Sequence, residues 1–249
     1  MSKVIAIANH KGGVGKTTSV ACIGAALATH GKRTLLIDLD AQQNLTFILI
    51  GDKEIESSVY NSLTGGTPLP IIKVKENLDL VPSSLELARA ETDLSSKLMR
   101  EAQLKNRIAE IADNYDYILL DCPPSLGIIT TNALVAATEL YIPLTAEALP
   151  LKGLTMLEEV VDEVREQINS RLRLGGVFLT RYNNRRLNKE VEEAISSRYG
   201  SKVFATKIRE NIALAEMPVT GSTIFEYDPS SNGAKDYESL TLEILSRDN

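Results

Sequence analysis

The fold is decided by the stretch Ala8-Asn9-His10-Lys11-Gly12-Gly13-Val14-Gly15-Lys16-Thr17-Thr18. Apolar residues 4–7 precede it, and a helical pattern of apolar residues, Val20, Ile23 and Leu27, follows it. The stretch is therefore predicted to be a turn between a buried strand and a helix. A phosphate-binding loop requires this context.

The glycines and the Lys-Thr pair of this stretch suit an anionic ligand. Gly12, Gly13 and Gly15 allow the backbone to curl so that its N–H groups point inward. Lys16 can reach the β- and γ-phosphates of a nucleotide, and the Thr17 hydroxyl suits Mg²⁺. The helix that follows adds its positive N-terminal end. These residue types together predict a nucleotide site.

The loop departs from the GxxxxGK[ST] pattern in one respect. Counting back from Lys16, the first glycine of the pattern falls on His10, and a second lysine, Lys11, stands before the glycines. Thr18, at the start of the helix, has two possible roles: its hydroxyl supports the α-phosphate, or it caps the helix. The sequence therefore predicts a variant phosphate loop with two lysines.

Composition sets limits on the class of protein. With 249 residues, 43% of them hydrophobic, residues 1–249 can form a single domain with one core. The net charge of −6 gives no general attraction to nucleic acid, so DNA contact would need a local basic patch. Cys22 and Cys122 lie far apart in apolar surroundings, which favours buried, reduced thiols over a metal or redox pair. No apolar run reaches transmembrane length and the chain shows no leader, so we expect a soluble, cytoplasmic protein without a membrane partner.

Strand and helix patterns alternate along the chain. Strands are expected at 34–38, 117–121, 139–143, 175–180 and 203–208, and helices at 16–29, 91–113, 127–137, 151–170, 187–198 and 233–246. Residues 51–82 are less regular and are expected to form an excursion from the main sheet, with a short strand at 78–81. The alternation predicts an α/β fold, a single-domain P-loop NTPase with a twisted, mostly parallel sheet flanked by helices on both faces.

Acidic residues stand at the ends of two predicted strands. Asp38 and Asp40 are expected to project to the same side, where one serves the water shell of a metal ion and the other orients an attacking water. Thr17 can hold Mg²⁺ directly and Asp121 through water, because Mg²⁺ keeps several of its waters. With only two histidines in the chain, a nucleophilic Ser-His-Asp hydrolase is unsupported. The residues therefore favour phosphoryl transfer.

In combination, these motifs resemble the ParA/MinD superfamily of deviant Walker A ATPases, and within it the ParA-type (Soj-like) chromosome and plasmid partition ATPases. The resemblance covers nearly the whole chain. It is carried by KGGVGKTT at 11–18, LLIDLDAQQNLT at 35–46, YDYILLDCPPSLGIITTNAL at 115–134, GVFLTRYNNRR at 176–186 and AEMPVTGSTIFEYDPSSNGAKDY at 215–237. It implies an ATPase that uses ATP and Mg²⁺, is weak unless stimulated, and acts in partitioning. An alternative within the superfamily is an ATPase that positions a protein cargo other than DNA.

The resemblance also implies roles for single residues. Lys11, Lys16 and Asp40 match catalytic positions: Lys11 crosses to the partner's nucleotide in an ATP-sandwich homodimer, and Asp40 orients the water. Asp121 matches the Walker B residue, and Asp38 and Thr17 join it at the metal. The nucleotide-binding positions are Lys11, Gly12, Gly13, Val14, Gly15, Lys16, Thr17 and Thr18.

Partition members of the superfamily bind nonspecific double-stranded DNA as ATP dimers and are stimulated by a ParB-type centromere-binding protein. The resemblance thus implies association with the nucleoid in the ATP-bound state. The basic residues expected to contact DNA are Arg181, Arg185, Arg186, Lys189 and Arg209, with Lys207 adjoining. Glu210 and Ala213 stand at positions where members of the superfamily often have basic residues. No N-terminal helix-turn-helix extension is expected, and the acidic terminal helix is expected to pack on the domain instead of binding membrane.

Overall fold

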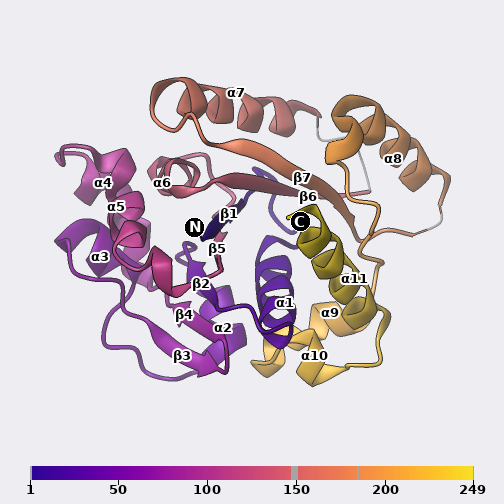
Figure 1. Ribbon diagram of the computed structural model, residues 1–249, viewed down its shortest axis with the longest axis horizontal. Coiled ribbons are helices and arrows are strands. Elements are labelled where there is room, and N and C mark those ends of the chain that lie inside the picture. The colour runs from indigo at the N-terminus through magenta and orange to yellow at the C-terminus, as the bar shows by residue number, and fades with distance from the viewer. Residues whose placement is uncertain (1, 147–150, 184, 249) are drawn as a thin grey trace.

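A single sheet forms the centre of the computed structural model, which describes residues 2–146, 151–183 and 185–248 (Figure 1). In the described residues the sheet has seven strands in the order β3-β4-β2-β5-β1-β6-β7. Their bounds are β1 (Lys3–Ile7), β2 (Thr34–Asp38), β3 (Ile72–Lys75), β4 (Leu78–Val81), β5 (Tyr117–Asp121), β6 (Glu139–Thr145) and β7 (Arg173–Thr180). All neighbours pair in parallel except β3 with β4. The mostly parallel α/β fold predicted from the sequence is confirmed.

Helices cover both faces of the sheet (Figure 1). The α-helices are α1 (Lys16–Thr29), α2 (Asn44–Ile50), α3 (Val59–Gly65), α4 (Ala90–Leu94), α5 (Gln103–Ala109), α6 (Ile128–Ala136), α7 (Leu151–Gln167), α8 (Arg186–Tyr199), α9 (Ile212–Glu216), α10 (Ile224–Tyr227) and α11 (Asn232–Arg247). Short 3₁₀ turns are η1 (Leu85–Arg89), η2 (Arg100–Ala102), η3 (Ala112–Asn114), η4 (Gly200–Lys202) and η5 (Met217–Thr220). No helix in the described part of the chain has the length and apolar character needed to cross a membrane.

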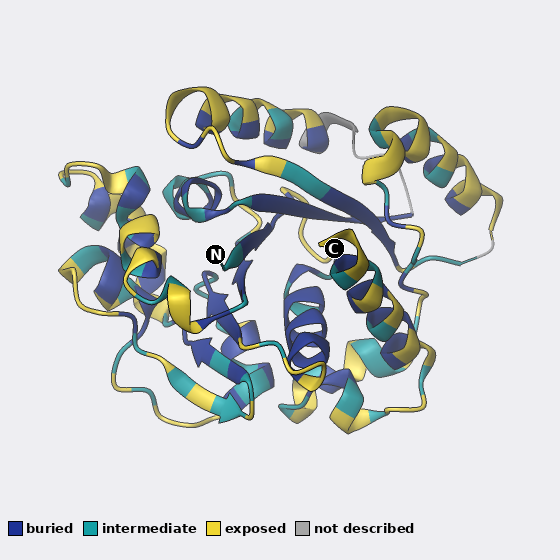
Figure 2. Ribbon diagram, in the orientation of Figure 1, coloured by how far each residue is buried: buried dark blue, intermediate teal, exposed yellow. Residues whose placement is uncertain are grey.

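The alternating side chains of the strands divide the core into two layers. On β1, Val4 and Ala6 join the cluster beneath α3 to α8, whereas Ile5 and Ile7 join the cluster beneath α1, α2 and α11. Both clusters are closed to solvent, as the dark blue strands of Figure 2 show. The continuous apolar runs that predicted two-sided burial are explained by this arrangement.

Two expectations about residues 51–113 are wrong. Residues 51–82 are no excursion, because β4 pairs with β2 and β3 pairs with β4, so this segment completes one edge of the main sheet. The helix expected over 91–113 is broken into α4, η2 and α5. Leu98 lies in the break and is 91% exposed.

The strand expected over 203–208 is also absent, although this segment does lie beside β7. The amides of Phe204 and Ile208 donate to β7, but those of Ala205 and Thr206 donate to the Glu243 carboxylate on α11. Because a side chain takes these two donors, only isolated bridges form here. The end of this segment, at Ile208, lines a hollow together with residues of the phosphate loop.

Candidate active site

The phosphate loop lies between β1 and α1, at the carboxyl edge of the parallel strands. Gly13 and Gly15 adopt φ values of 71° and 85°, which favour glycine, and Gly15 is the N-cap of α1. The side chain of Asn9 fixes the start of the loop: its Oδ1 accepts from the Lys11 amide at 2.9 Å, and its Nδ2 donates to the Pro143 carbonyl at 2.7 Å. The turn predicted between a strand and a helix is confirmed.

Two further contacts hold the loop from β7 and from α1. The Thr180 hydroxyl donates to the Val14 carbonyl at 2.9 Å, and the Ser19 hydroxyl donates to the Gly15 carbonyl at 2.6 Å. Both side chains are buried. The loop is therefore held in shape by buried side chains of the protein itself, next to the N-terminal end of α1.

Lys16 is buried at the base of the loop. Its Nζ donates to the Lys11 carbonyl at 3.3 Å. Burial lowers the pKa of Lys16, although the nearby carboxylates of Asp121 and Asp40 act in the opposite direction. A phosphate bound in the loop would lie close to the Lys16 ammonium and would stabilise its charged form, which burial disfavours.

Asp121, at the end of β5, is fully buried. Neither of its carboxylate oxygens accepts a hydrogen bond of ordinary geometry from the described residues, although the Thr17 hydroxyl lies close enough to affect its pKa. Burial, and next the charge of Asp38, raise its pKa well above the usual range, while the Thr17 hydroxyl and Lys16 act to lower it. Buried carboxylate oxygens without partners are what a hydrated cation would satisfy, so Asp121 and Thr17 fit a Mg²⁺ ion.

Asp38 and Asp40, which the sequence predicts to project to the same side, differ in burial: Asp38 is buried and Asp40 is partly exposed. Asp38 points inward and accepts three hydrogen bonds, from the Asp40 amide at 3.0 Å and from the amide and hydroxyl of Thr46 at 2.8 and 2.7 Å. Burial raises the pKa of Asp38 to about 6. Asp40 is partly exposed in the turn after β2, where it accepts from the Gln42 amide at 3.0 Å. Asp38 therefore braces the turn that carries Asp40.

Lys11 and Gly12 lie on the surface of the loop. The Lys11 Nζ donates to the Thr145 hydroxyl of the same chain at 3.3 Å. A Cβ added to Gly12 would meet no atom within 4 Å, so the fold of one chain does not require glycine here. Both residues are accessible to a ligand or to a second molecule.

A hollow of about 430 Å³ opens beside the phosphate loop. Its walls include Thr18 of α1, Ile208, Asn211 and Leu214 of the segment after β7, and Tyr237 of α11. Such a mixed apolar and polar cleft, adjoining the loop, has the size and position for a nucleoside. The sequence has no local motif for it, because its walls come from several distant segments.

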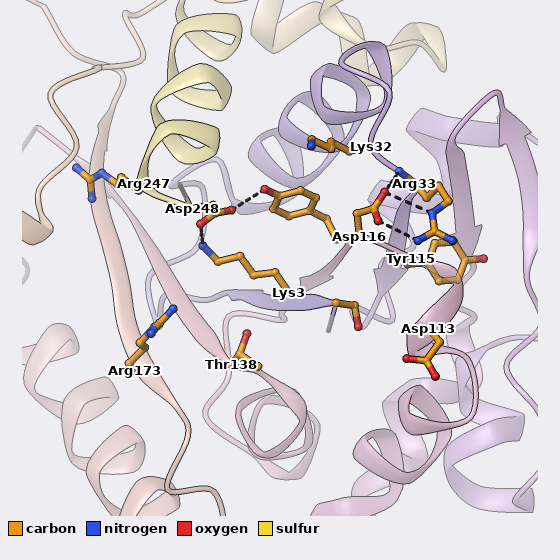
Figure 3. A pocket seen from close by; sticks show the side chains of 12 residues that line it. Lys3, Lys32, Arg33, Asp113, Tyr115, Asp116, Thr138, Arg173, Arg247 and Asp248 are labelled. Carbon is orange, nitrogen blue, oxygen red and sulfur yellow. Dashed lines mark hydrogen bonds and ion pairs between the residues drawn. The ribbon is translucent and has the colours of Figure 1, made fainter.

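A second hollow, of about 580 Å³, lies at the opposite, amino edge of the strands (Figure 3). Two pairs of its charged side chains are in contact, Lys3 with Asp248, and Arg33 with Asp116 at 2.9 Å. The Tyr117 hydroxyl also donates to Asp248, at 2.5 Å. The contacts of Asp248 attach the end of α11 to β1 and β5, and the hollow lies at the edge of the sheet opposite the phosphate loop.

The basic residues expected to bind DNA lie in different surroundings, and Lys207 among them pairs with Glu192. Arg185, Arg186 and Lys189 are exposed together at the start of α8. Arg209 is instead held by the Asp236 carboxylate of α11, its guanidinium nitrogens lying 2.6 to 3.1 Å from the two oxygens. Arg181 is exposed after β7, and its guanidinium lies 3.9 Å from Glu210.

These features define the class: an α/β protein with a P-loop and with buried acidic residues at the carboxyl edge of its sheet. Residues 2–174 match the AAA domain family. Chromosome-partitioning ATPase Soj of Treponema pallidum is 42% identical over 100% of this chain and 99% of its own. The chain belongs to this AAA-domain family, in its ParA/Soj branch.

Solved structures of similar fold contain nucleotide. Cobyrinic acid a,c-diamide synthase from Mycobacterium smegmatis, with bound ADP and magnesium, matches with a TM-score of 0.87 and 34% identity, over 99% of this chain and 95% of its own. A Borrelia burgdorferi protein described as a plasmid partition protein, bound to AMPPNP, matches with a TM-score of 0.86 and 28% identity, over 100% of both chains. The family resemblance seen in the sequence is confirmed.

Proposed function

We propose that the protein is an ATP-hydrolysing molecular switch in chromosome or plasmid partitioning. ATP holds two copies together as a sandwich dimer, the dimer binds DNA nonspecifically, and a ParB-type partner stimulates hydrolysis. The observation that carries the proposal is the buried, unpartnered Asp121 carboxylate beside Lys16 and the phosphate loop. The name and full-length similarity of the Treponema pallidum relative support partitioning as the process.

Different residues of the site bind the phosphates, hold the metal ion and orient the attacking water in phosphoryl transfer. Lys16 and the loop amides bind the phosphates, and Thr17 and Asp121 would hold Mg²⁺. When bound, this ion neutralises charge on the phosphate oxygens. Asp40 orients the attacking water from the turn that Asp38 braces. The chain's own contribution is thus positioning and charge compensation.

The dimer part of the proposal is supported by the surface of the loop. Lys11 is exposed, and the contact of its Nζ with Thr145 at 3.3 Å is one that a stronger partner such as a phosphate could replace. Gly12 leaves open space that its own chain does not use. A cation reaching the partner's nucleotide would stabilise the dimer only while ATP is bound, so hydrolysis would release the subunits.

Replacing Asp40 by alanine tests the switch. We expect the Asp40→Ala variant to lose phosphate release by about a hundredfold or more, because the water is no longer oriented, and to remain dimeric with ATP. Phosphate release and light scattering after gel filtration measure both properties. Asp113→Ala, at the amino edge of the sheet, is the control and should match wild type.

An Asp40→Ala variant that stays monomeric with ATP would contradict the proposal.

Retention of DNA on a filter, with ATP, separates the partition switch from an ATPase that positions another cargo. The cargo alternative predicts a dimer that does not retain DNA.

A further inference from the structure

One wall of the nucleoside-sized hollow is formed by residues 208–211, and residues 203–207 lead into it. The whole stretch, 203–211, is here called the wall segment. Strand β7 holds it at two points, where the amides of Phe204 and Ile208 donate to carbonyls of β7, both at 2.8 Å. Between these points the amides do not pair with β7, and buried backbone donors need another acceptor. The position of the wall therefore depends on a second support.

Two carboxylates of α11 provide this support. The two oxygens of Glu243 accept from the Ala205 amide at 2.9 Å and from the Thr206 amide at 3.0 Å. Asp236 accepts from the Arg209 amide at 2.9 Å. Because about two helical turns separate Asp236 from Glu243, both lie on the same face of α11. This face of the helix thus holds backbone donors along the wall segment.

Glu243 is itself oriented by Arg247, one turn further along α11. The Nη2 of Arg247 donates to Glu243 at 2.8 Å and to the Val203 carbonyl at 3.0 Å. Its guanidinium carbon lies 3.8 Å from the centroid of the Phe204 ring. Since this arginine binds both the carboxylate and the wall segment, it fixes the Glu243 oxygens towards the amides that they accept from.

Helix α11 also contacts the phosphate loop. Tyr237 lines the hollow, and its hydroxyl lies 2.9 Å from the Ser19 hydroxyl, which donates to the Gly15 carbonyl at 2.6 Å. The helix packs along α1, whose N-cap is Gly15 (Figure 1). One helix is therefore connected both to the loop that binds phosphates and to the segment that lines the hollow. It sets the distance between these two parts of the site.

We propose that Glu243 and Asp236 are positioning residues of the nucleotide site, which hold the wall segment where it contacts the nucleoside of ATP. Neither residue lines the hollow, so each acts through the backbone that it holds. The inference rests on the proposed function only in that a nucleoside triphosphate occupies the phosphate loop and the hollow together. It assigns to α11 the preference of the site for a nucleotide over a bare polyphosphate.

Binding of a nucleotide and of its phosphates alone, compared in one variant, tests this role. The ligands are AMPPNP and inorganic tripolyphosphate, each with Mg²⁺, and calorimetry measures their affinities for the full chain. Glu243→Ala leaves the Ala205 and Thr206 amides without their acceptor, so the nucleoside must order the wall segment when it binds. We expect the affinity for AMPPNP to fall about tenfold or more. The affinity for tripolyphosphate should stay within about twofold of wild type, because the contacts of the phosphate loop are unchanged.

Two further variants complete the test. Glu243→Gln keeps one acceptor oxygen, so it should lose affinity for AMPPNP selectively but by only about threefold. Glu238→Ala is the matched control for Glu243→Ala: it makes the same change on the same helix, at a side chain that is 39% exposed and pairs with His30 at 2.7 Å. It should leave both affinities within about twofold of wild type.

The comparison of ligands separates a positioning role from a general one. Equal losses of affinity for AMPPNP and tripolyphosphate in Glu243→Ala would show that the substitution disturbs the whole site, and unchanged affinity for AMPPNP would show that the wall needs no support from α11. Either result would overturn the inference. Both ligands bind without turnover, so failure of the wild type to dimerise or to hydrolyse ATP would count against the proposed function and leave the positioning role standing.

Discussion

Thr46 is the residue that holds the buried Asp38 carboxylate. Its amide and hydroxyl both donate to Asp38, and its hydroxyl also accepts from the Ser83 amide at 3.0 Å. Thr46→Val removes the hydroxyl and leaves the Ser83 amide without this acceptor. We expect the free energy of unfolding, from urea titration, to fall by about 1–3 kcal/mol. Thr46→Ser, which keeps the hydroxyl, is the control and should lose clearly less.

The same variant predicts a pH dependence. Burial raises the pKa of Asp38 to about 6 from 3.8, so the carboxyl favours the folded state most at low pH, and this contribution is lost as the pH rises through about 6. The hydrogen bond from the Thr46 hydroxyl lowers the pKa of Asp38, and its removal in Thr46→Val raises this pKa further. The cost of Thr46→Val should therefore be larger at about pH 7.5 than at about pH 5. Equal costs at the two pH values would contradict this account of Asp38.

The positions of residues in local motifs could be predicted from the sequence. Contacts between residues far apart in the sequence could not. Lys16, Thr17 and Asp121 come together as expected, because each follows from the spacing of a loop or the end of a strand. Thr180, which bonds to Val14, is 166 residues away from it, and the sequence offers no signal for that contact. Asn9 was also missed, since an asparagine before a turn has many possible roles.

At the scale of elements, the boundaries marked by strong local signals were the accurate ones. Helix α1 starts and ends where expected, and Gly31 follows it with a φ of 73°. Helix α2 was missed because a short apolar run is equally consistent with a strand. The failed strand at 203–208 depended on Glu243, a distant competitor for its amides. The secondary structure of these segments therefore depends on tertiary contacts as well as on local sequence.

Strand β7 depends on a glycine where it meets the C-terminal region. A Cβ at Gly176 would overlap the ring of Phe204, which packs edge-on against Tyr141 at 5.4 Å. Gly176→Ala should lower the free energy of unfolding by about 1–3 kcal/mol through overpacking, as measured by urea titration. Gly65→Ala is the matched control, because a Cβ there would meet Thr67 at an ordinary 3.9 Å. Similar effects of the two substitutions would show that the ring moves aside freely.

At the scale of the whole molecule, α11 connects the two edges of the sheet. Near its start, Asp236 holds Arg209 at the wall of the nucleoside-sized hollow, and at its end Asp248 contacts Lys3 and Tyr117. Arg209 therefore both lines this hollow and links α11 to the segment after β7. Of the residues proposed for DNA contact, Arg185, Arg186 and Lys189 are exposed together at the start of α8, where Arg186 pairs with Glu190 at 2.9 Å.

A salt series on DNA retention tests that cluster against the net charge of −6 of the whole chain. Because a net-negative protein is repelled by DNA in general, binding must depend on local phosphate contacts, and each contact contributes about 0.9 to the slope of log affinity against log salt. The double variant Arg185→Ala/Arg186→Ala, with ATP, should therefore lose affinity and reduce the slope by roughly 1 to 2. Lys53→Ala, an exposed charge on another part of the surface, is the control and should keep the wild-type slope. A double variant with unchanged slope and affinity would remove α8 from the DNA interface, whatever the outcome for ATP hydrolysis.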